Sequence, residues 1–143
     1  MLDTYSFYLI TNKDHTQIYI GRTSKWVTKR WQQHLSSMRH NRAVTKPLQQ
    51  CYNNAAPLLF QCIGLLQCDK SVAENIEAAF YDLYKGKDYT MLNAKRPTVK
   101  TKLSDIELKH YLALAQIGAI KYSTIYKYFA AEVYYNPTEY YKI

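Results

Sequence analysis

Three stretches decide the fold expected for this chain: Tyr5-Ser-Phe-Tyr-Leu-Ile10, Tyr19-Ile-Gly21 and Arg30-Trp-Gln-Gln-His34. The first two are short and rich in aromatic and β-branched residues, as β-strands are. The sequence between them, residues 11–16, consists mostly of turn-forming residues. The pattern therefore predicts a β-hairpin followed by a helix.

The hairpin is expected to bring two tyrosines together. If it folds between Lys13 and Asp14, Tyr8 and Tyr19 lie opposite one another on one face of the sheet. Gly21 then ends the second strand, at a point where the backbone turns sharply or lets a ligand approach closely.

Residues 26–38 are expected to form a helix, because apolar residues recur there at helical spacing. Arg30 and His34 are four residues apart and therefore lie together on one flank of the apolar stripe. A flank position has solvent on one side, where a cation is held rigidly and still reaches a ligand. The stripe consists of Val27, Trp31, Leu35 and Met38.

The middle of the chain predicts a loop, a short helix and a buried strand. His40-Asn-Arg42 has loop character, and Pro47 is suited to open a short helix that runs to Tyr52. Residues 58–66 are almost continuously apolar, which favours a buried strand, although periodicity does not distinguish it from a helix.

A second long helix is expected from Ser71, with Glu74 as its capping-box partner. Glu74 then points away from the apolar stripe, into solvent. Glu77 falls at the edge of the stripe, about 110° from its centre, where a carboxylate is held by the core and still faces a cleft. The stripe consists of Val72, Ile76, Ala79, Phe80 and Leu83.

The C-terminal third begins with residues 94–102, which hold four basic residues and no acid and predict an extended linker or basic arm. Residues 104–117 and 121–131 follow as two expected helices, with a turn at Ile117-Gly118 and a capping box of Ser104 and Glu107 in the first helix. A helical pair packed on the body is favoured, and a helix-turn-helix is the alternative.

The charge of the chain is basic, and the excess is not evenly distributed. The net charge is +8, and all of it lies in residues 1–102, which hold 15 basic and 7 acidic residues. Such a body suits a polyanionic partner, although many basic proteins have none. The apolar fraction of 48% is ample for a folded core.

Several classes of protein are excluded by composition. No apolar run approaches the roughly 18–20 residues of a membrane span, and the N-terminus lacks a secretory signal. Cys51, Cys62 and Cys68 lack zinc-site spacing and are expected to be buried free thiols. The protein is therefore expected to be cytoplasmic, or nuclear or nucleoid-associated with DNA, and not secreted.

At these residues the chain resembles the GIY-YIG nuclease family, which includes phage intron homing enzymes, some restriction enzymes, and repair and junction-resolving nucleases. The resemblance covers roughly residues 5–95, with five elements in the family's order and approximate spacing. They are Ser6-Phe7-Tyr8, Tyr19-Ile20-Gly21, Arg30 with His34, Glu77 in Glu-Ala-Ala-Phe-Tyr, and Asn93 in Met-Leu-Asn.

Three departures from the family pattern stand out. Ser6 replaces a glycine, which bears on backbone packing there, and Phe7 replaces an isoleucine. Arg30 also follows the second motif one residue later than expected, so the loop at 22–26 is expected to be longer.

The resemblance implies a metal-dependent DNA endonuclease that leaves 5′-phosphate and 3′-hydroxyl ends. Glu77 would hold one divalent cation, Mg²⁺ or Mn²⁺, with waters and phosphate completing its shell. Arg30 would bind the scissile phosphate, and His34 would relay a proton or contact phosphate. Tyr8 or Tyr19 would orient or deprotonate the water, for which nearby cations must lower a pKa of ordinarily ~10. The resemblance favours Tyr8 as the base; the residues themselves leave both open.

Further residues are expected to contact DNA. Asn93 is also a candidate for bracing the site, and the loop and arm residues are expected at the DNA backbone. The expected substrate-binding residues are Gly21, Arg22, His40, Arg42, Asn93, Lys95 and Arg96.

Together the elements predict an α+β fold: a small antiparallel sheet of about three strands, flanked by helices, with a C-terminal helical extension. The expected division is a GIY-YIG-like nuclease domain at 1–94, a basic linker at 95–102 and the helical extension at 103–143.

Two alternative functions remain open at this point. One is a nucleic-acid-binding module on the same scaffold with little or no catalysis. The other is a protein-interaction or homo-oligomer role for the tyrosine-rich C-terminal region. Among nucleases, three scattered cysteines do not build the zinc module of junction-resolving members. A small phage, mobile-element or viral endonuclease, or a compact restriction enzyme, is therefore expected by elimination.

Overall fold

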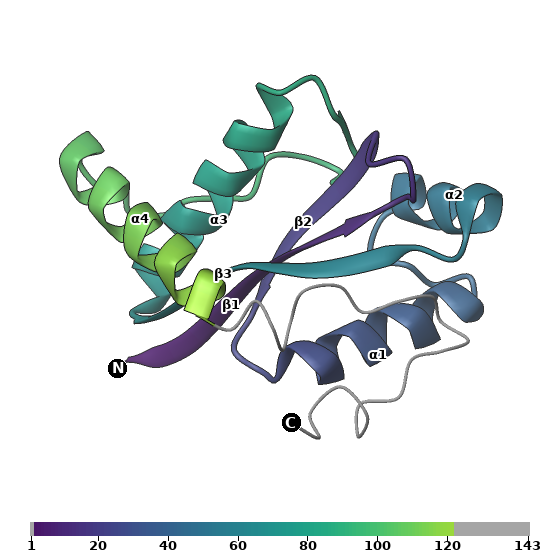
Figure 1. Ribbon diagram of the computed structural model, residues 1–143, viewed down its shortest axis with the longest axis horizontal. Helices are drawn as coiled ribbons and strands as arrows, with labels where there is room; N and C mark the ends of the chain where they lie inside the picture. The colour runs from purple at the N-terminus through teal and green to yellow at the C-terminus, as the bar shows by residue number, and fades with distance from the viewer. Residues whose placement is uncertain (1, 122–143) are drawn as a thin grey trace.

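The computed structural model describes residues 2–121, which form a sheet with helices on both of its faces (Figure 1). The strands are β1 (Asp3–Thr11), β2 (Gln17–Thr23), β3 (Leu59–Cys68) and β4 (Thr90–Met91), and the helices are α1 (Val27–Arg39), α2 (Lys46–Ala55), α3 (Lys70–Lys85) and α4 (Asp105–Lys121).

The sheet has the strand order β3-β1-β2-β4. Strand β1 pairs antiparallel with β2 and with β3, whereas the short β4 pairs parallel with β2. The predicted α+β class is confirmed. The sheet has one strand more than expected and is mixed, because the segment after α3 returns along the free edge of β2.

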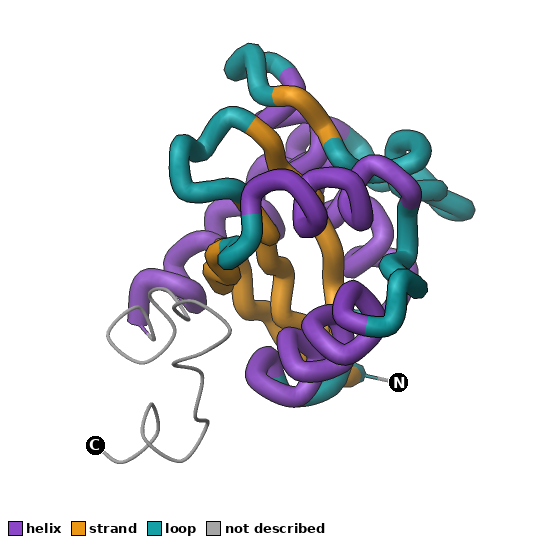
Figure 2. The backbone as a smooth tube through the Cα atoms, turned by 90° about the vertical axis from the view of Figure 1, so that its right-hand side faces the viewer, coloured by secondary structure: helices purple, strands orange, loops and turns teal. Residues whose placement is uncertain are grey.

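Alternate residues of β1 enter two different hydrophobic cores, because this strand has a neighbour on each side and helices over both faces. Tyr8 and Ile10 pack with α1 and α2 in the first core. Phe7 and Leu9 pack with α3 and α4 in the second core. Figure 2 shows the strands running through the interior between the helices.

The register of the β1–β2 hairpin differs from the expectation by two residues. Tyr8 lies opposite Gly21, and Tyr19 lies opposite Ile10. The two tyrosines are therefore diagonal neighbours and not direct partners. Because the shift is an even number of residues, both still lie on the same face of the sheet.

The shifted register follows from the turn, which Asn12 organises. The side-chain oxygen of Asn12 accepts hydrogen bonds from the backbone N–H groups of Thr16 and Gln17, at 2.9 and 3.1 Å. Its backbone oxygen accepts from the N–H of His15 at 3.0 Å. This network centres the turn later in the chain than the expected fold point between Lys13 and Asp14.

Helix α1 and strand β3 confirm the sequence interpretation. The apolar stripe of α1 is buried, and Trp31 at its centre stacks near Phe60 of β3 with ring centroids 5.0 Å apart. The expected strand at 58–66 is β3, which extends to Cys68. Pro47 lies in the first turn of α2, as predicted, where Thr45 is the N-cap.

Helix α3 corrects three expectations. Asp69 is its N-cap residue and Ser71 lies inside the helix, so the expected capping box with Glu74 does not form. Glu74 is 7% exposed, where a solvated position was expected. Leu83, placed in the apolar stripe, is instead exposed. The first half of α3 is buried around most of its circumference, because the sheet and the segment before α4 both cover it.

The basic segment before α4 is fastened along α3 by one amide. The side-chain nitrogen of Asn75 donates to the carbonyl of Thr101 at 2.7 Å, and its oxygen accepts from the N–H of Leu103 at 3.1 Å. The capping box of Ser104 and Glu107 then opens α4, as predicted.

Helix α4 continues through the turn expected at Ile117-Gly118. Gly118 is required for packing: a Cβ there would overlap the carbonyl oxygen of Leu65 in β3. The expected helix at 121–131 and the tyrosine-rich region lie beyond residue 121, outside the described residues.

The three cysteines are free and buried, as expected. Burial raises the pKa of the Cys62 thiol to about 11, which keeps it protonated and unreactive. No helix within residues 2–121 is long and apolar enough to cross a membrane.

The close approach at Gly118 predicts a stability effect. Gly118→Ala is expected to lower the free energy of unfolding by about 1–3 kcal/mol, because the added methyl group forces α4 away from β3. Gly86→Ala, at the end of α3 where φ is −67°, is the matched control and should change it by less than about 1 kcal/mol. Urea denaturation measures both, and equal losses in the two variants would contradict this packing.

Candidate active site

Tyr8 is positioned by the absence of a side chain on Gly21. Its ring lies across β2, and a Cβ at Gly21 would overlap the ring carbon and oxygen of the phenol. Strand β2 continues to Thr23, so Gly21 does not end the strand or turn the backbone as expected. Its role in the fold is to make room for Tyr8.

The Tyr8 hydroxyl joins the sheet to α1 through two hydrogen bonds. Its oxygen lies 2.7 Å from Nε2 of His34 and accepts from Nε of Arg30 at 3.2 Å. The pair on α1 works as a unit because residues i and i+4 share a helix face. His34 is only 1% exposed, so the wet flank position expected for it is wrong.

The positions of the protons depend on the tautomer of His34. Arginine is only a donor, so the phenol oxygen accepts from Arg30, and in the tautomer with Nε2 unprotonated the phenol donates its own hydrogen to that nitrogen. Burial, and then the nearby Arg30, lower the pKa of His34 to about 3, which makes the imidazole neutral. In that tautomer the imidazole proton is on Nδ1, which is buried without a hydrogen-bond partner among the described residues.

The two tyrosines are both poor acids in this environment. Burial is the main cause that raises the pKa of Tyr8 well above its ordinary value, and Arg30 opposes it. Burial also raises the pKa of the half-buried Tyr19. The rings of Tyr8 and Tyr19 lie 6.5 Å apart between centroids, and Tyr19 also contacts the ring of His34.

Two carboxylates of α3 face Arg22 of β2. Nη1 of Arg22 lies 2.5 Å from Oε1 of Glu77, and its Nη2 lies 3.9 Å from Oε2 of Glu74. Both glutamates share this side of the helix because they are three residues apart. Burial raises the pKa of Glu77, while the Arg22 guanidinium acts to lower it. The carboxylate at the edge of the core, predicted for Glu77, is therefore accompanied by a second and more buried one.

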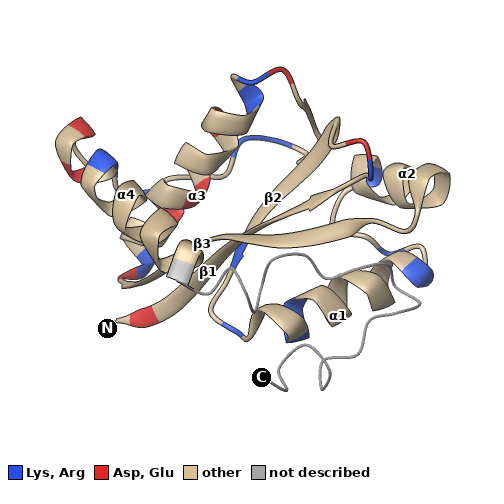
Figure 3. Ribbon diagram, viewed as in Figure 1, with Lys and Arg blue, Asp and Glu red and all other residues tan. Residues whose placement is uncertain are grey.

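The Arg22–Glu77 pair borders a hollow of about 480 Å³. Three more cations line its wall (Lys25, Arg30 and Lys70), and we call it the basic cleft. Figure 3 shows basic positions on β2, on the loop after it and on the start of α1, with acidic positions on α3 nearby. Four cations around one carboxylate favour an anionic ligand.

A smaller hollow of about 300 Å³ lies on the other side of the same ion pair. Tyr19 borders it together with Asn93 and the predicted DNA-contact residues Lys95 and Arg96. Arg96 forms a two-point ion pair with Asp82, with both N–O distances 2.9 Å. Tyr8 and His34 border neither hollow.

Asn93 holds β2 in place. Its side-chain oxygen accepts from the N–H of Ile20 at 3.0 Å, and its nitrogen donates to the carbonyl of the same residue at 2.8 Å. Both polar atoms of the amide are thus committed to the backbone next to Tyr19 and Gly21. This geometry suits the bracing role considered for Asn93.

His40 and Arg42 lie apart from both hollows. His40 is exposed at the end of α1, where its Nδ1 lies 2.7 Å from the carbonyl of Ser36, and Arg42 is exposed in the loop that follows.

The sequence analysis missed several residues that border the basic cleft. Lys25 lies in the loop after the second motif, and Lys70 opens α3. Glu74, which borders the smaller hollow, was set aside as a helix cap. The sequence did contain a signal for Glu74: it lies three residues before Glu77, and this spacing puts both carboxylates on the same side of the helix.

A family model for the GIY-YIG catalytic domain matches residues 4–90 of the chain. The chain belongs to the GIY-YIG family. The matched region contains both tyrosines, Arg30, His34 and Glu77, and it ends before Asn93. The resemblance drawn from the motifs is confirmed, and endonuclease activity is implied at the level of the family.

Among solved structures, the chain is similar to the catalytic domain of the intron endonuclease I-TevI in a glutamate-to-alanine mutant form. The TM-score is 0.56 and the sequence identity is 16%, with 67% of this chain and 98% of that chain covered. At this identity the similarity shows a common GIY-YIG fold. No curated protein sequence matches the chain.

The buried imidazole predicts a pH dependence of stability. The pKa of His34 is lowered to about 3 in the folded chain and is ~6.5 in the unfolded chain. At pH values between these two pKa values only the unfolded state binds the proton. The contribution of His34 to the free energy of unfolding is therefore complete above pH ~6.5 and is lost as the pH falls toward 3. The loss approaches roughly 1.4 kcal/mol per pH unit.

Urea unfolding at pH 7, 6 and 5 measures this effect, with His34→Gln as the comparison. The variant should show a flatter profile than the wild type. An NMR titration in which the His34 ring of the folded protein protonates near pH 6.5 would contradict the prediction.

Proposed function

We propose that this GIY-YIG domain is a metal-dependent DNA endonuclease that leaves 5′-phosphate and 3′-hydroxyl ends. The observation that supports this best is the position of Arg30. Its side chain borders the basic cleft, while its Nε is held by the buried hydroxyl of Tyr8. This geometry supports a phosphate-binding role for Arg30 directly beside a tyrosine–histidine pair that would accept a proton.

The basic cleft is the proposed phosphate site. Arg30 uses one donor on Tyr8 and one on Oε1 of Gln33, at 3.3 Å. The remaining donors of its planar fork match the oxygens of a phosphate. Lys25 and Lys70 would neutralise neighbouring phosphates of the DNA backbone.

The residues present fit one Mg²⁺ or Mn²⁺ ion at Glu77. Residues 2–121 contain no cluster of three or more His, Cys, Asp or Glu side chains that could hold a metal. Magnesium does not need such a cage, because it keeps several waters and takes one or two carboxylates. Glu77 offers a hard oxygen at the wall of a cleft with room for those waters. When bound, the ion would supply charge that stabilises the phosphoryl oxygens and the leaving group.

Arg22 shares the Glu77 carboxylate in this structure. Binding of a cation at Glu77 would release Arg22 to pair with Glu74 or with a DNA phosphate. Glu74 is therefore well placed to pair with Arg22 when Glu77 coordinates the metal ion.

We assign the general-base role to Tyr8 with His34 as its proton acceptor. A free tyrosinate is disfavoured, since burial raises the pKa of Tyr8. A relay avoids it: the phenol oxygen would take a proton from water while its own proton passes to Nε2 of His34, which lies 2.7 Å away. Because burial and Arg30 lower the pKa of His34 to about 3, this transfer requires the negative charge of a bound phosphate to raise that pKa and stabilise the imidazolium. Tyr8 lies behind Arg30, so the relay requires Arg30 to turn toward the phosphate and leave the phenol oxygen to the water.

A DNA-binding module with little catalysis is the second candidate, and the Arg22–Glu77 ion pair favours it. In that case Glu77 is a counter-ion for Arg22 and not a metal ligand. Ser6 and the late position of Arg30 are the sequence departures in its favour. This candidate predicts DNA binding that does not respond to magnesium or to Tyr8→Phe.

Glu77→Ala is expected to reduce nicking of supercoiled plasmid in Mg²⁺ by roughly 100-fold or more, because it removes the proposed metal ligand and its several kcal/mol of charge stabilisation. EDTA should abolish nicking by the wild type. Asp105→Ala, an exposed carboxylate in the first turn of α4, is the matched control and should nick normally. Calorimetric titration with Mn²⁺ in the absence of DNA should show weaker binding to Glu77→Ala than to the wild type. The Asp105→Ala control should bind Mn²⁺ as the wild type does. No nicking by the wild type at any protein excess would overturn the proposal.

Substitution of the two tyrosines should change kcat to different extents. Tyr8→Phe is expected to lower kcat by roughly 10²–10⁴-fold, the range of a lost general base, with little change in KM. Tyr19→Phe keeps the ring packing and should lower kcat by less than about tenfold, because Tyr8 keeps its acceptor. Single-turnover cleavage measures both. A larger loss in Tyr19→Phe would transfer the base role to Tyr19.

A further inference from the structure

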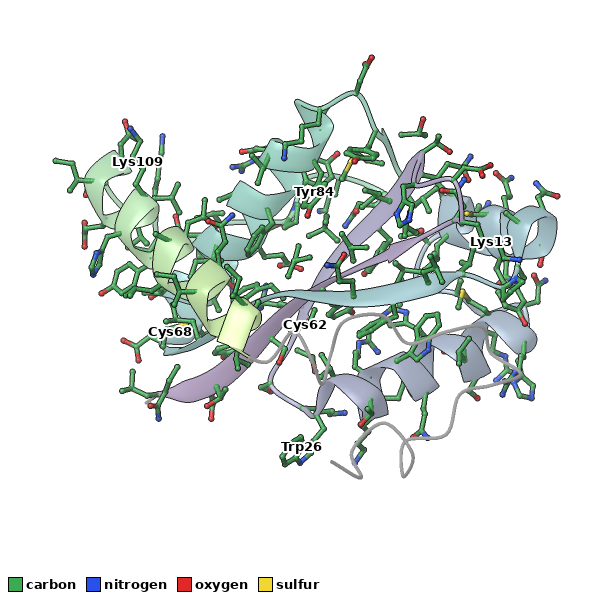
Figure 4. All side chains as sticks on the ribbon, viewed as in Figure 1. Lys13, Trp26, Cys62, Cys68, Tyr84 and Lys109 are labelled. Atoms are coloured by element: carbon green, nitrogen blue, oxygen red, sulfur yellow. The ribbon has the colours of Figure 1, made fainter. Side chains whose placement is uncertain are left out.

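Trp26 lies on the surface in front of α1. Its side chain is 72% exposed, whereas Trp31, five residues later, is completely buried. Figure 4 shows Trp26 projecting outward at the start of the helix. Trp26 is the N-cap residue of α1 and makes no capping hydrogen bond, so helix formation does not account for it. A single exposed apolar residue is ordinary, and the case therefore rests on what lies beside it.

Beside Trp26 is a hollow of about 420 Å³, which we call the side hollow. Trp26, Val27 and Leu65 provide apolar walls, and Thr4 and Ser6 of β1 provide hydroxyl groups. A nucleobase has the complementary character: its faces are flat and stack on aromatic rings, and its edges form hydrogen bonds. Ser6, which replaces the family's glycine, thus contributes a polar group to this hollow.

The side hollow adjoins the basic cleft. Ser24 and Lys25 border both of them. A strand whose phosphate lies in the basic cleft would therefore have an adjoining base within reach of the side hollow. The cations of the cleft favour a nucleic acid as the occupant over an apolar protein surface.

We propose that Trp26 and the side hollow receive a nucleobase next to the phosphate held in the basic cleft, and that the protein therefore prefers DNA with an unpaired base at this position. The proposal rests on the proposed function, since it takes the basic cleft as the phosphate site. Trp26 is a positioning residue in this scheme and does not touch the reacting atoms.

The preference for an unpaired base follows from the cost of exposing one. In a duplex the bases are stacked inside, so a paired base reaches the side hollow only after it unstacks and unpairs. That cost is smallest when the base is mismatched, bulged or in a single strand. The stacking gained on Trp26 is then available as binding affinity.

The test measures binding without metal, so that no cleavage occurs. Two labelled duplexes are compared in EDTA by fluorescence anisotropy, one fully paired and one with a single unpaired nucleotide at its centre. The wild type is expected to bind the second duplex roughly 5- to 150-fold more tightly, the range of one base–aromatic stack. Trp26→Ala should bring this ratio close to one. Trp26→Phe, which keeps a ring, should retain most of it.

The control is Ile106→Ala, an exposed apolar residue on α4, which should keep the wild-type ratio. Tryptophan fluorescence supplies a second measurement, because the chain has two tryptophans and only Trp26 is exposed. The unpaired duplex should quench the emission of the wild type and not that of Trp26→Phe.

Three results would overturn the inference: a wild-type ratio near one, a ratio unchanged in Trp26→Ala, or equal quenching in wild type and Trp26→Phe. Each of them leaves the plasmid assay untouched, so the proposed function can survive. Conversely, Trp26-dependent binding in a protein that never nicks DNA would overturn the nuclease and keep the inference. If Trp26→Ala keeps the preference for the unpaired duplex but loses binding to another protein, Trp26 contacts a protein partner and the nucleobase is rejected.

Discussion

The contact between the ring of Tyr8 and the bare backbone of Gly21 is the constraint on which the rest of the site depends. Because nothing projects from Gly21, the phenol lies across β2 and its hydroxyl reaches α1. There it fixes Arg30 and His34 at once. A larger residue at position 21 would displace the phenol. Helix α1 and the sheet would then separate at the point where the Tyr8 hydroxyl binds Arg30.

Strand β2 connects the two halves of the site because its side chains alternate between faces. Tyr19 and Gly21 face α1, and Arg22 points to the opposite face and meets the carboxylates of α3. The buried Tyr8–His34 pair, proposed as the proton acceptor, thus lies on the side of the first core, and the carboxylates beside the basic cleft lie on the side of the second. Asn93 locks the strand between them through Ile20. Neither core alone could assemble both functions.

Much of the fold and of the candidate site could be predicted from the periodicity of the sequence, and the errors have identifiable causes. The stripe of α1 and the shared face of Tyr8 and Tyr19 follow from local spacing, which tertiary contacts did not override. The register was missed because it depends on the side-chain hydrogen bonds of Asn12. Glu74 was placed in solvent, and His34 on a flank with solvent on one side, because helical angle says nothing of what packs from outside the helix. Gly118 was interpreted as a turn, although it permits close packing on β3.

Two of the three departures from the family pattern lie together, while the third, Phe7, is buried in the second core. Ser6 and the loop that carries Lys25 and Trp26 border the same side hollow, while Tyr8 and Glu77 lie outside it. Tyr8 and Glu77, the residues proposed for the chemistry, are constrained by a hydrogen bond or an ion pair to other elements. A surface loop and one residue on a strand are free of those constraints. In the proposed scheme change is thus possible in the side hollow, and the fold would separate the residues that attack a phosphate from those that select the DNA.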